Sequence, residues 1–162
     1  MDLPLHPALV HLPLGLALVT PLVMMGTLLA WWRGLLPRKA WGIPVGMLAL
    51  LAAGCLLGQR TGEEDAHIVQ DLLSHELIEA HEEAAERFTF VAFFSLAFGA
   101  IALGIPSERM AQGVALGATG LSLVTAGLGA YAGHEGGELV YVHGAAQAHG
   151  AVVDPACEHG GC

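Results

Sequence analysis

The segment His6–Gly15, HPALVHLPLG, begins an apolar run that continues to Trp32 and carries two histidines, His6 and His11. A helix needs about 20 apolar residues to cross the hydrocarbon core of a bilayer, and this run is long enough. An ionisable side chain near the start of such a segment is costly in lipid unless it has a partner, so it marks a functional site by default. The segment therefore predicts a membrane-spanning helix that carries a functional histidine.

The chain of 162 residues is 54% hydrophobic and only 13% charged, which is too apolar for a soluble domain of this size. Its hydropathy predicts four membrane spans, at Ala8–Trp32, Ala40–Gln59, Phe88–Ile105 and Ala111–Ala132. Because no alternating strand pattern is present, a β-barrel is disfavoured. We expect an all-α, polytopic four-transmembrane-helix bundle over residues 1–144, with helical extensions on its outer side. A Gly/Ala-rich Cys/His tail with little regular structure is expected over residues 145–162.

Basic residues are divided unequally between the two sides of this predicted topology. Four of the six lie between spans one and two or between spans three and four, at Arg33, Arg38, Lys39 and Arg109. Cytoplasmic loops carry an excess of Lys and Arg. The expected location is therefore the bacterial inner (cytoplasmic) membrane, multi-pass, with both termini periplasmic.

Acids and histidines gather on the opposite side. Of the 15 acids only Glu108 lies with the basic loops, and all nine histidines lie at or beyond the outer side. The net charge of −9 thus belongs to an acidic, histidine-rich outer cap. An acidic cap argues against nucleic acid as a partner, since nucleic-acid binding needs a basic face. It favours cations or a basic redox partner in the periplasm or the membrane.

The polar connection of residues 61–88 is periodic enough to be mostly helix, extending spans two and three beyond the bilayer. Thr61 with Glu64 matches a capping box and predicts a helix start, and Glu83 with Arg87 has the spacing of an ion pair across one turn. The glycines of spans two and four predict close helix packing, within the chain or in a homodimer. The tryptophans Trp31, Trp32 and Trp41 are expected to be interfacial anchors.

Histidines of different helices are expected to meet at the outer end of the bundle, where bundles commonly hold metals and cofactors. His11 shares a helix face with Leu14 and Gly15, so it is predicted to point inward, and His81 is predicted to do the same. His6 is expected to be an accessory residue at the mouth. The candidate cofactor ligands are therefore His11, His81, His143 and His6. The alternative for His11 is a side chain bonded to a neighbouring backbone carbonyl.

Two inward histidines suit either of two chemistries. Imidazole is the usual axial ligand of haem iron, which predicts a haem b electron-transfer module. It also binds Zn, Cu or non-haem Fe, for which the candidate ligands are His11, His81, His143, His134, Glu82, Glu138 and Glu63. No nucleophile motif or HExxH helix is present, so a binding or electron-transfer module is favoured over a stand-alone enzyme. A purely structural subunit, whose histidines only form hydrogen bonds, is the third alternative.

Three motifs resemble the bacterial membrane-protein family catalogued as domain of unknown function 2231. They are HPALVHLPLG, the His81–Glu82 pair and GGELVYVHG at residues 136–144, and the resemblance extends to about Gly144. It implies a small four-span inner-membrane module in redox company, because related chains are often joined to Rieske-type or c-type haem domains. The matching positions are His6, His11, His81, Glu82, Gly136, Gly137, Glu138 and His143.

This chain departs from the family pattern at two points. Leu12 stands where an aromatic residue is common, and we expect the Cys/His tail that ends in CEHGGC to take the place of an attached redox domain. If the tail is periplasmic, Cys157 and Cys162 are expected to form a local disulfide, because that compartment is oxidising.

Overall fold

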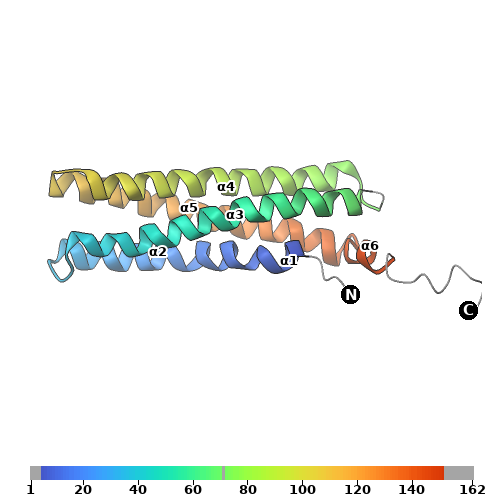
Figure 1. The fold of residues 1–162 in the computed structure, drawn as a ribbon, viewed down its shortest axis with the longest axis horizontal. Coiled ribbons are helices and arrows are strands. Elements are labelled where there is room, and N and C mark those ends of the chain that lie inside the picture. The colour runs from blue at the N-terminus through green and yellow to red at the C-terminus, as the bar shows by residue number, and fades with distance from the viewer. Residues whose placement is uncertain (1–4, 71, 152–162) are drawn as a thin grey trace, which may run out of the picture.

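The computed structural model describes residues 5–70 and 72–151, and every regular element in these ranges is helical. The four long helices are each long and apolar enough to cross a membrane, which confirms the predicted all-α bundle with four spans. They are joined or flanked by short helical elements (Figure 1). In chain order the elements are α1 Leu5–Leu9, α2 His11–Trp32, η1 Arg38–Trp41, α3 Gly42–Val69, α4 His75–Gly104, α5 Glu108–Tyr141 and α6 Ala146–Ala151.

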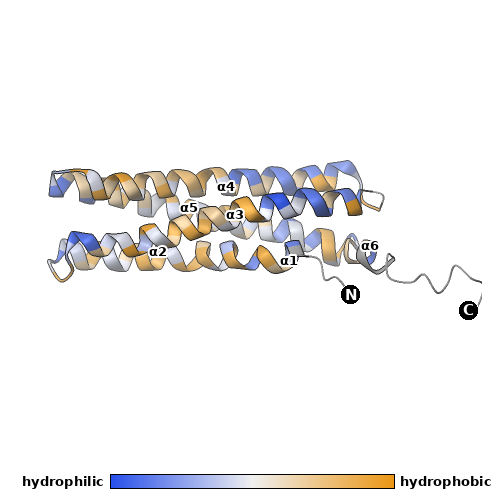
Figure 2. Ribbon diagram, viewed as in Figure 1, coloured by the Kyte–Doolittle hydropathy of each residue, from blue (hydrophilic) through white to orange (hydrophobic). Residues whose placement is uncertain are grey.

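The long helices run up and down, so that each end of the bundle collects particular connections. One end holds α1, the α3–α4 turn and α6, and we call residues 5–11, 59–70, 72–88 and 131–148 the acidic end. The other holds the α2–α3 and α4–α5 connections, and we call residues 31–41 and 102–110 the basic end. Figure 2 shows an apolar middle and hydrophilic residues concentrated where α3 and α4 meet.

Two helix ends at the basic end follow from local chemistry. After α2, Gly34 adopts φ +70, and this left-handed conformation lets the Gly34 N–H donate to the Trp31 carbonyl at 3.0 Å. Helix α4 ends at Gly104, and Ile105 is extended because the next residue, Pro106, disfavours helical geometry before it.

The polar connection is helical almost throughout, as predicted, but it contains no helix start at Thr61. Helix α3 passes through that residue without interruption, and the Thr61 hydroxyl donates back to the carbonyls of the preceding turn at 3.1 Å. The capping-box prediction is therefore wrong, because the apolar span and its polar extension form one helix. The predicted ion pair is confirmed, with Arg87 Nη2 lying 2.6 Å from Glu83 Oε2.

The tryptophans are mostly core residues and not interfacial anchors. Trp41 is fully buried and its indole N–H donates to the Gly99 carbonyl at 3.0 Å. Trp31 is also buried and its indole N–H donates to the Glu108 carboxylate, which joins the end of α2 to the start of α5. Only Trp32, of the three, is exposed as the belt prediction requires.

A layer of hydroxyl groups lies inside the bundle between two apolar clusters. Thr20, Ser95, Ser122 and Thr125 are all at most 2% exposed. Ser95 Oγ of α4 and Thr125 Oγ1 of α5 are 3.0 Å apart, so these helices share a hydrogen bond in the middle of the bundle. Such bonds satisfy polar groups that lipid cannot.

Some of the glycines permit the predicted close packing. A Cβ at Gly54 would lie 3.2 Å from Pro13 of α2, and one at Gly129 would lie 2.9 Å from the Phe88 ring of α4. A Cβ at Gly42 or Gly46 would meet no heavy atom within 4 Å, so that pair does not bring helices together.

The chain continues as an ordered part of the acidic end for several residues after Gly144. Gly144 has φ +76, and after it Ala145 and Ala148 are buried in an apolar cluster with Val69 and Leu73 of the α3–α4 turn. The expectation of little regular structure is therefore wrong for residues 145–148. The predicted Cys157–Cys162 disulfide lies outside the described residues.

Candidate functional site

A cavity of about 620 Å³ lies at the acidic end, between the four long helices and the short helices α1 and α6. Most of its wall is apolar, with Leu14 of α2, Phe88 of α4 and Val140 of α5 among the lining residues, together with the buried thiol of Cys55. Pockets that hold small molecules or cofactors measure about 300–1,000 Å³ and combine an apolar wall with a few polar groups. The volume and composition of this cavity fit that description.

His6 lines this cavity and is held by helix α3. Its Nδ1 lies 3.0 Å from the Gly58 carbonyl and 3.1 Å from the Thr61 hydroxyl. The ring rests on Gly62, where a Cβ would lie 3.1 Å from the imidazole. Because Nδ1 donates to a carbonyl, the lone pair of the neutral ring is on Nε2. His6 is thus a fixed, half-buried residue of the cavity wall, and its predicted accessory role stays a prediction.

His11 is exposed, and its Nδ1–H donates to the Pro7 carbonyl one turn earlier. It borders the cavity, but the prediction that it points into the bundle is wrong. Its apolar neighbour Gly15 is exposed too, so that face of α2 lies toward the surface. Lipid tails are as apolar as a protein core, which is why an apolar face did not reveal which way His11 points. The alternative of a carbonyl-bonded histidine describes its geometry.

His81 of α4 faces the cavity, as predicted. Its ring rests on Gly136 of α5, where a Cβ would lie 2.9 Å from the imidazole Cε1. Its Nδ1 is buried without a hydrogen-bond partner, and the backbone of Ala132 lies near the ring. The His6 and His81 ring centroids are 6.4 Å apart, with the ring planes at 82°. Residues 75 positions apart in the sequence therefore present two imidazoles to one cavity.

The other predicted ligands are divided between the cavity and the surface. Glu63 and Glu82 line its rim. His134 and Glu138 instead pair with each other on the exposed side of α5, with His134 Nε2 and Glu138 Oε1 3.3 Å apart. His143 is exposed and does not line the cavity. Within residues 5–70 and 72–151, no three or more His, Cys, Asp or Glu side chains are arranged to hold a metal ion.

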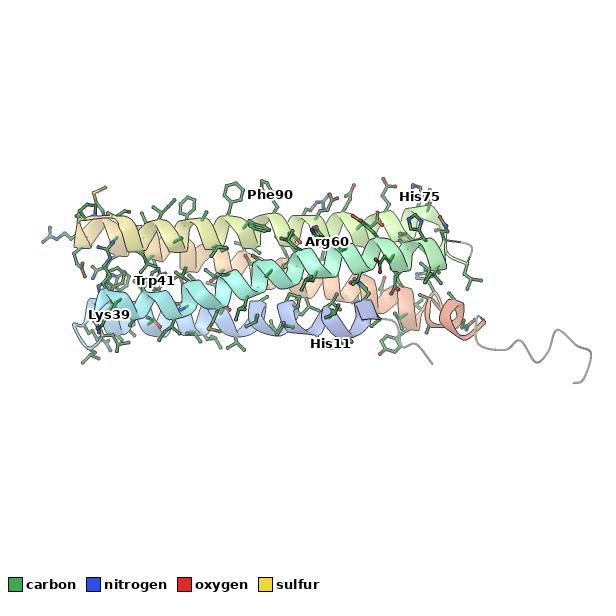
Figure 3. All side chains as sticks on the ribbon, viewed as in Figure 1. His11, Lys39, Trp41, Arg60, His75 and Phe90 are labelled. Carbon is green, nitrogen blue, oxygen red and sulfur yellow. The ribbon has the colours of Figure 1, made fainter. Side chains whose placement is uncertain are left out.

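The rim of the cavity is strongly acidic. Four carboxylates from α3 and α4 line it, those of Glu63, Asp65, Glu82 and Glu86. Figure 3 shows that the labelled residue His75 lies further out on the same end of the bundle, whereas Lys39 and Trp41 lie at the opposite end. An acidic rim attracts cations by its summed field.

Sequence reasoning missed the glycines that hold the two imidazoles. Every fourth residue of one α3 face is a glycine, at Gly54, Gly58 and Gly62. Gly54 lies against Pro13 of α2, Gly58 lies against Val10, and Gly62 lies against His6. The regular spacing is visible in the sequence and marks a face that another chain segment can approach closely. Gly136 is within a matching family motif, but nothing in the sequence pairs it with His81.

No family model, curated protein or solved structure matches this chain. The resemblance to domain of unknown function 2231 therefore stays a prediction.

Proposed function

We propose that this protein is a membrane electron-transfer module that would bind haem b in the acidic-end cavity, where His6 and His81 would hold the iron. The observation that carries the proposal is the pair of imidazoles from α1 and α4, with centroids 6.4 Å apart, inside a mainly apolar cavity of about 620 Å³. Bis-imidazole ligation in an apolar helix bundle is a known way of holding haem iron.

The two rings fit the role of ligands in different ways. A ligating histidine almost always donates its other ring N–H to a carbonyl or carboxylate. His6 already does so, because its Nδ1 donates to Gly58 and leaves Nε2 for a metal. His81 has a buried Nδ1 without a hydrogen bond, and such an atom is costly unless a partner completes it. We expect the bound state to supply Nδ1 with an acceptor, which would give His81 the same arrangement as His6.

The chain supplies binding, orientation and exclusion of water at this site. Gly62 and Gly136 hold the rings by close contact, and Phe88 and Leu14 provide apolar wall. When bound, haem supplies one-electron redox chemistry. The acidic surface around the rim would favour a basic periplasmic or membrane redox protein as the partner. We also propose that the acidic end lies at the periplasmic face of the bacterial inner membrane, because the basic residues gather at the opposite end.

The test is an absorption spectrum of protein purified after haem-replete expression, oxidised and then reduced with dithionite. Wild-type protein is expected to show a Soret band, and His6→Ala and His81→Ala are expected to lose or shift it. His75→Ala is the matched control, because His75 is exposed on the same helix as His81 and outside the cavity. No Soret band in the wild type, or the same band in all variants, would refute the proposal.

A second candidate is a Zn, Cu or non-haem Fe site that uses the same two histidines. The four rim carboxylates favour a free cation and oppose the negatively charged propionates of haem. Against it, a protein-only site needs three or more ligands, and the described residues offer no such group. Elemental analysis of the same preparations separates the two, since one metal per chain without porphyrin would identify the second candidate.

A further inference from the structure

A second cavity, of about 490 Å³, lies between α2 and α5 in the half of the bundle near the basic end. Its wall is almost wholly apolar, and most of its residues are exposed on the outer surface of the bundle. We call it the α2–α5 groove, and it is lined by Met25, Leu28, Leu29, Trp32, Leu116, Thr119, Gly120 and Leu123. A surface of this composition in a membrane span faces lipid, so an apolar chain is the chemistry that fits the groove.

Gly120 keeps the groove open in its middle. A Cβ at this position would meet no heavy atom within 4 Å, although both neighbouring turns of α5 contribute leucines to the wall. Gly127, two turns further along α5, is equally open but lies outside the groove. The two glycines therefore form a matched pair for substitution.

Two arginines follow the groove residues toward the basic end, since Arg33 comes directly after Trp32 of the wall and Arg109 lies two helical turns before Leu116. The hydrogen bond from the Trp31 indole to Glu108 joins the last turn of α2 to the first residue of α5. Arg33 lies two residues after Trp31, and Arg109 comes directly after Glu108. The two arginines therefore lie at the same corner of the bundle. Both are exposed, and within the described part of the chain neither forms a hydrogen bond or ion pair through its side chain. Arg38, by contrast, donates to helix carbonyls of α4.

We propose that the α2–α5 groove binds one anionic phospholipid of the bilayer, with an acyl chain along the groove and the phosphate between Arg33 and Arg109. Basic pockets between membrane helices are known sites for anionic headgroups, and guanidinium groups bind phosphate with charge-assisted hydrogen bonds. Trp32 lines the groove next to Arg33, and indole rings favour the headgroup level. A free phosphate would leave the groove unfilled, and a zwitterionic lipid such as phosphatidylcholine would bring its own ammonium group close to the two arginines, which an anionic lipid does not. The proposal does not depend on the acidic-end cavity or its occupant.

The experiment is native mass spectrometry of the full chain in detergent, titrated with phosphatidylglycerol or with phosphatidylcholine of the same acyl chains. We expect one phosphatidylglycerol per chain to be retained in preference to phosphatidylcholine. Arg33→Gln and Arg109→Gln should each weaken phosphatidylglycerol binding about five-fold, from the energy of one basic residue at an anionic surface. The control Lys39→Gln removes a basic residue of the same end that is not next to the groove, and it should leave the preference unchanged.

Gly120→Leu should weaken binding of both lipids by filling the groove, whereas Gly127→Leu should not. Equal retention of the two lipids by the wild type would overturn the proposal. So would wild-type retention of phosphatidylglycerol by a variant that combines Arg33→Gln with Arg109→Gln. So would a dimer mass that Gly120→Leu converts to monomer, because a second copy would then occupy the groove. If Gly120→Leu does not fold, Gly120→Ala and the arginine variants decide the result.

Discussion

Replacing Gly136 by alanine would place a methyl group 2.9 Å from the His81 imidazole. Replacing Gly137, the next residue of the same helix, would place one where no heavy atom lies within 4 Å. Both glycines are half-buried and both line the acidic-end cavity. They differ in one structural respect, which is contact with the imidazole.

The size of the effect follows from two opposing terms. Alanine favours a helix over glycine by about 0.8–1.0 kcal/mol, and this gain is common to both variants. Overpacking at a buried contact destabilises by about 1–3 kcal/mol, and this loss applies to Gly136→Ala alone. Gly137→Ala should therefore be as stable as the wild type or slightly more so. Gly136→Ala should be about 1–3 kcal/mol less stable than Gly137→Ala.

The assay is reversible unfolding by sodium dodecyl sulfate in mixed micelles, followed by circular dichroism, without added haem or metal. His81→Ala removes the ring and should relieve the clash, so Gly136→Ala and His81→Ala should couple favourably by about 0.5–3 kcal/mol in a double-mutant cycle. Equal stability of the two glycine variants would refute the packing of His81 on Gly136. So would a coupling energy of zero.

The remaining predictions use the same preparations. His6→Ala removes a hydrogen bond to the Gly58 carbonyl and should lower the unfolding free energy by about 1 kcal/mol. His11 is exposed, so His11→Ala should change that free energy by less than about 0.5 kcal/mol. Equal losses would contradict the inward placement of His6. Ser95→Ala and Thr125→Ala should couple by about 0.6 kcal/mol, the mean for interhelical bonds in a membrane, and additive losses would show that the hydroxyls do not bond. Gly144 has a left-handed backbone conformation, which costs alanine about 1–2 kcal/mol. Gly144→Ala should therefore speed amide exchange at residues 145–148. Unchanged exchange would argue against the left-handed conformation of Gly144.

The four spans could be predicted because length and apolarity alone decide whether a helix can cross a bilayer. Which face of each helix points into the bundle could not be predicted in the same way. His6 and His11 show why, since the periodic rule that places apolar residues inside a soluble protein does not separate core from lipid. The proline-containing start of the first span adds to the difficulty, because α1 ends at Leu9 and α2 begins at His11. His81 was placed correctly because its helix extends beyond the apolar span, where polar and apolar faces do differ.

Other contacts were hidden because they depend on pairing between distant helices. The indole N–H of Trp31 donates to α5 and that of Trp41 donates to α4. Each acceptor is more than fifty residues away, so the sequence around either tryptophan does not predict it. The interfacial preference of tryptophan is a statistical tendency that a buried hydrogen bond can override. The helix start predicted at Thr61 was wrong for a related reason. A capping sequence does not begin a helix where the preceding residues already form one.

The central proposal is that His6 and His81 would hold haem iron, and electron paramagnetic resonance of the ferric protein tests it most directly. Two imidazoles on haem iron predict a low-spin signal in the wild type. Removal of either His6 or His81 should open a coordination position and convert the signal to high spin, while His75→Ala should leave it low-spin. Protein without haem iron after haem-replete expression, or a low-spin signal that persists in both His6→Ala and His81→Ala, would contradict the claim.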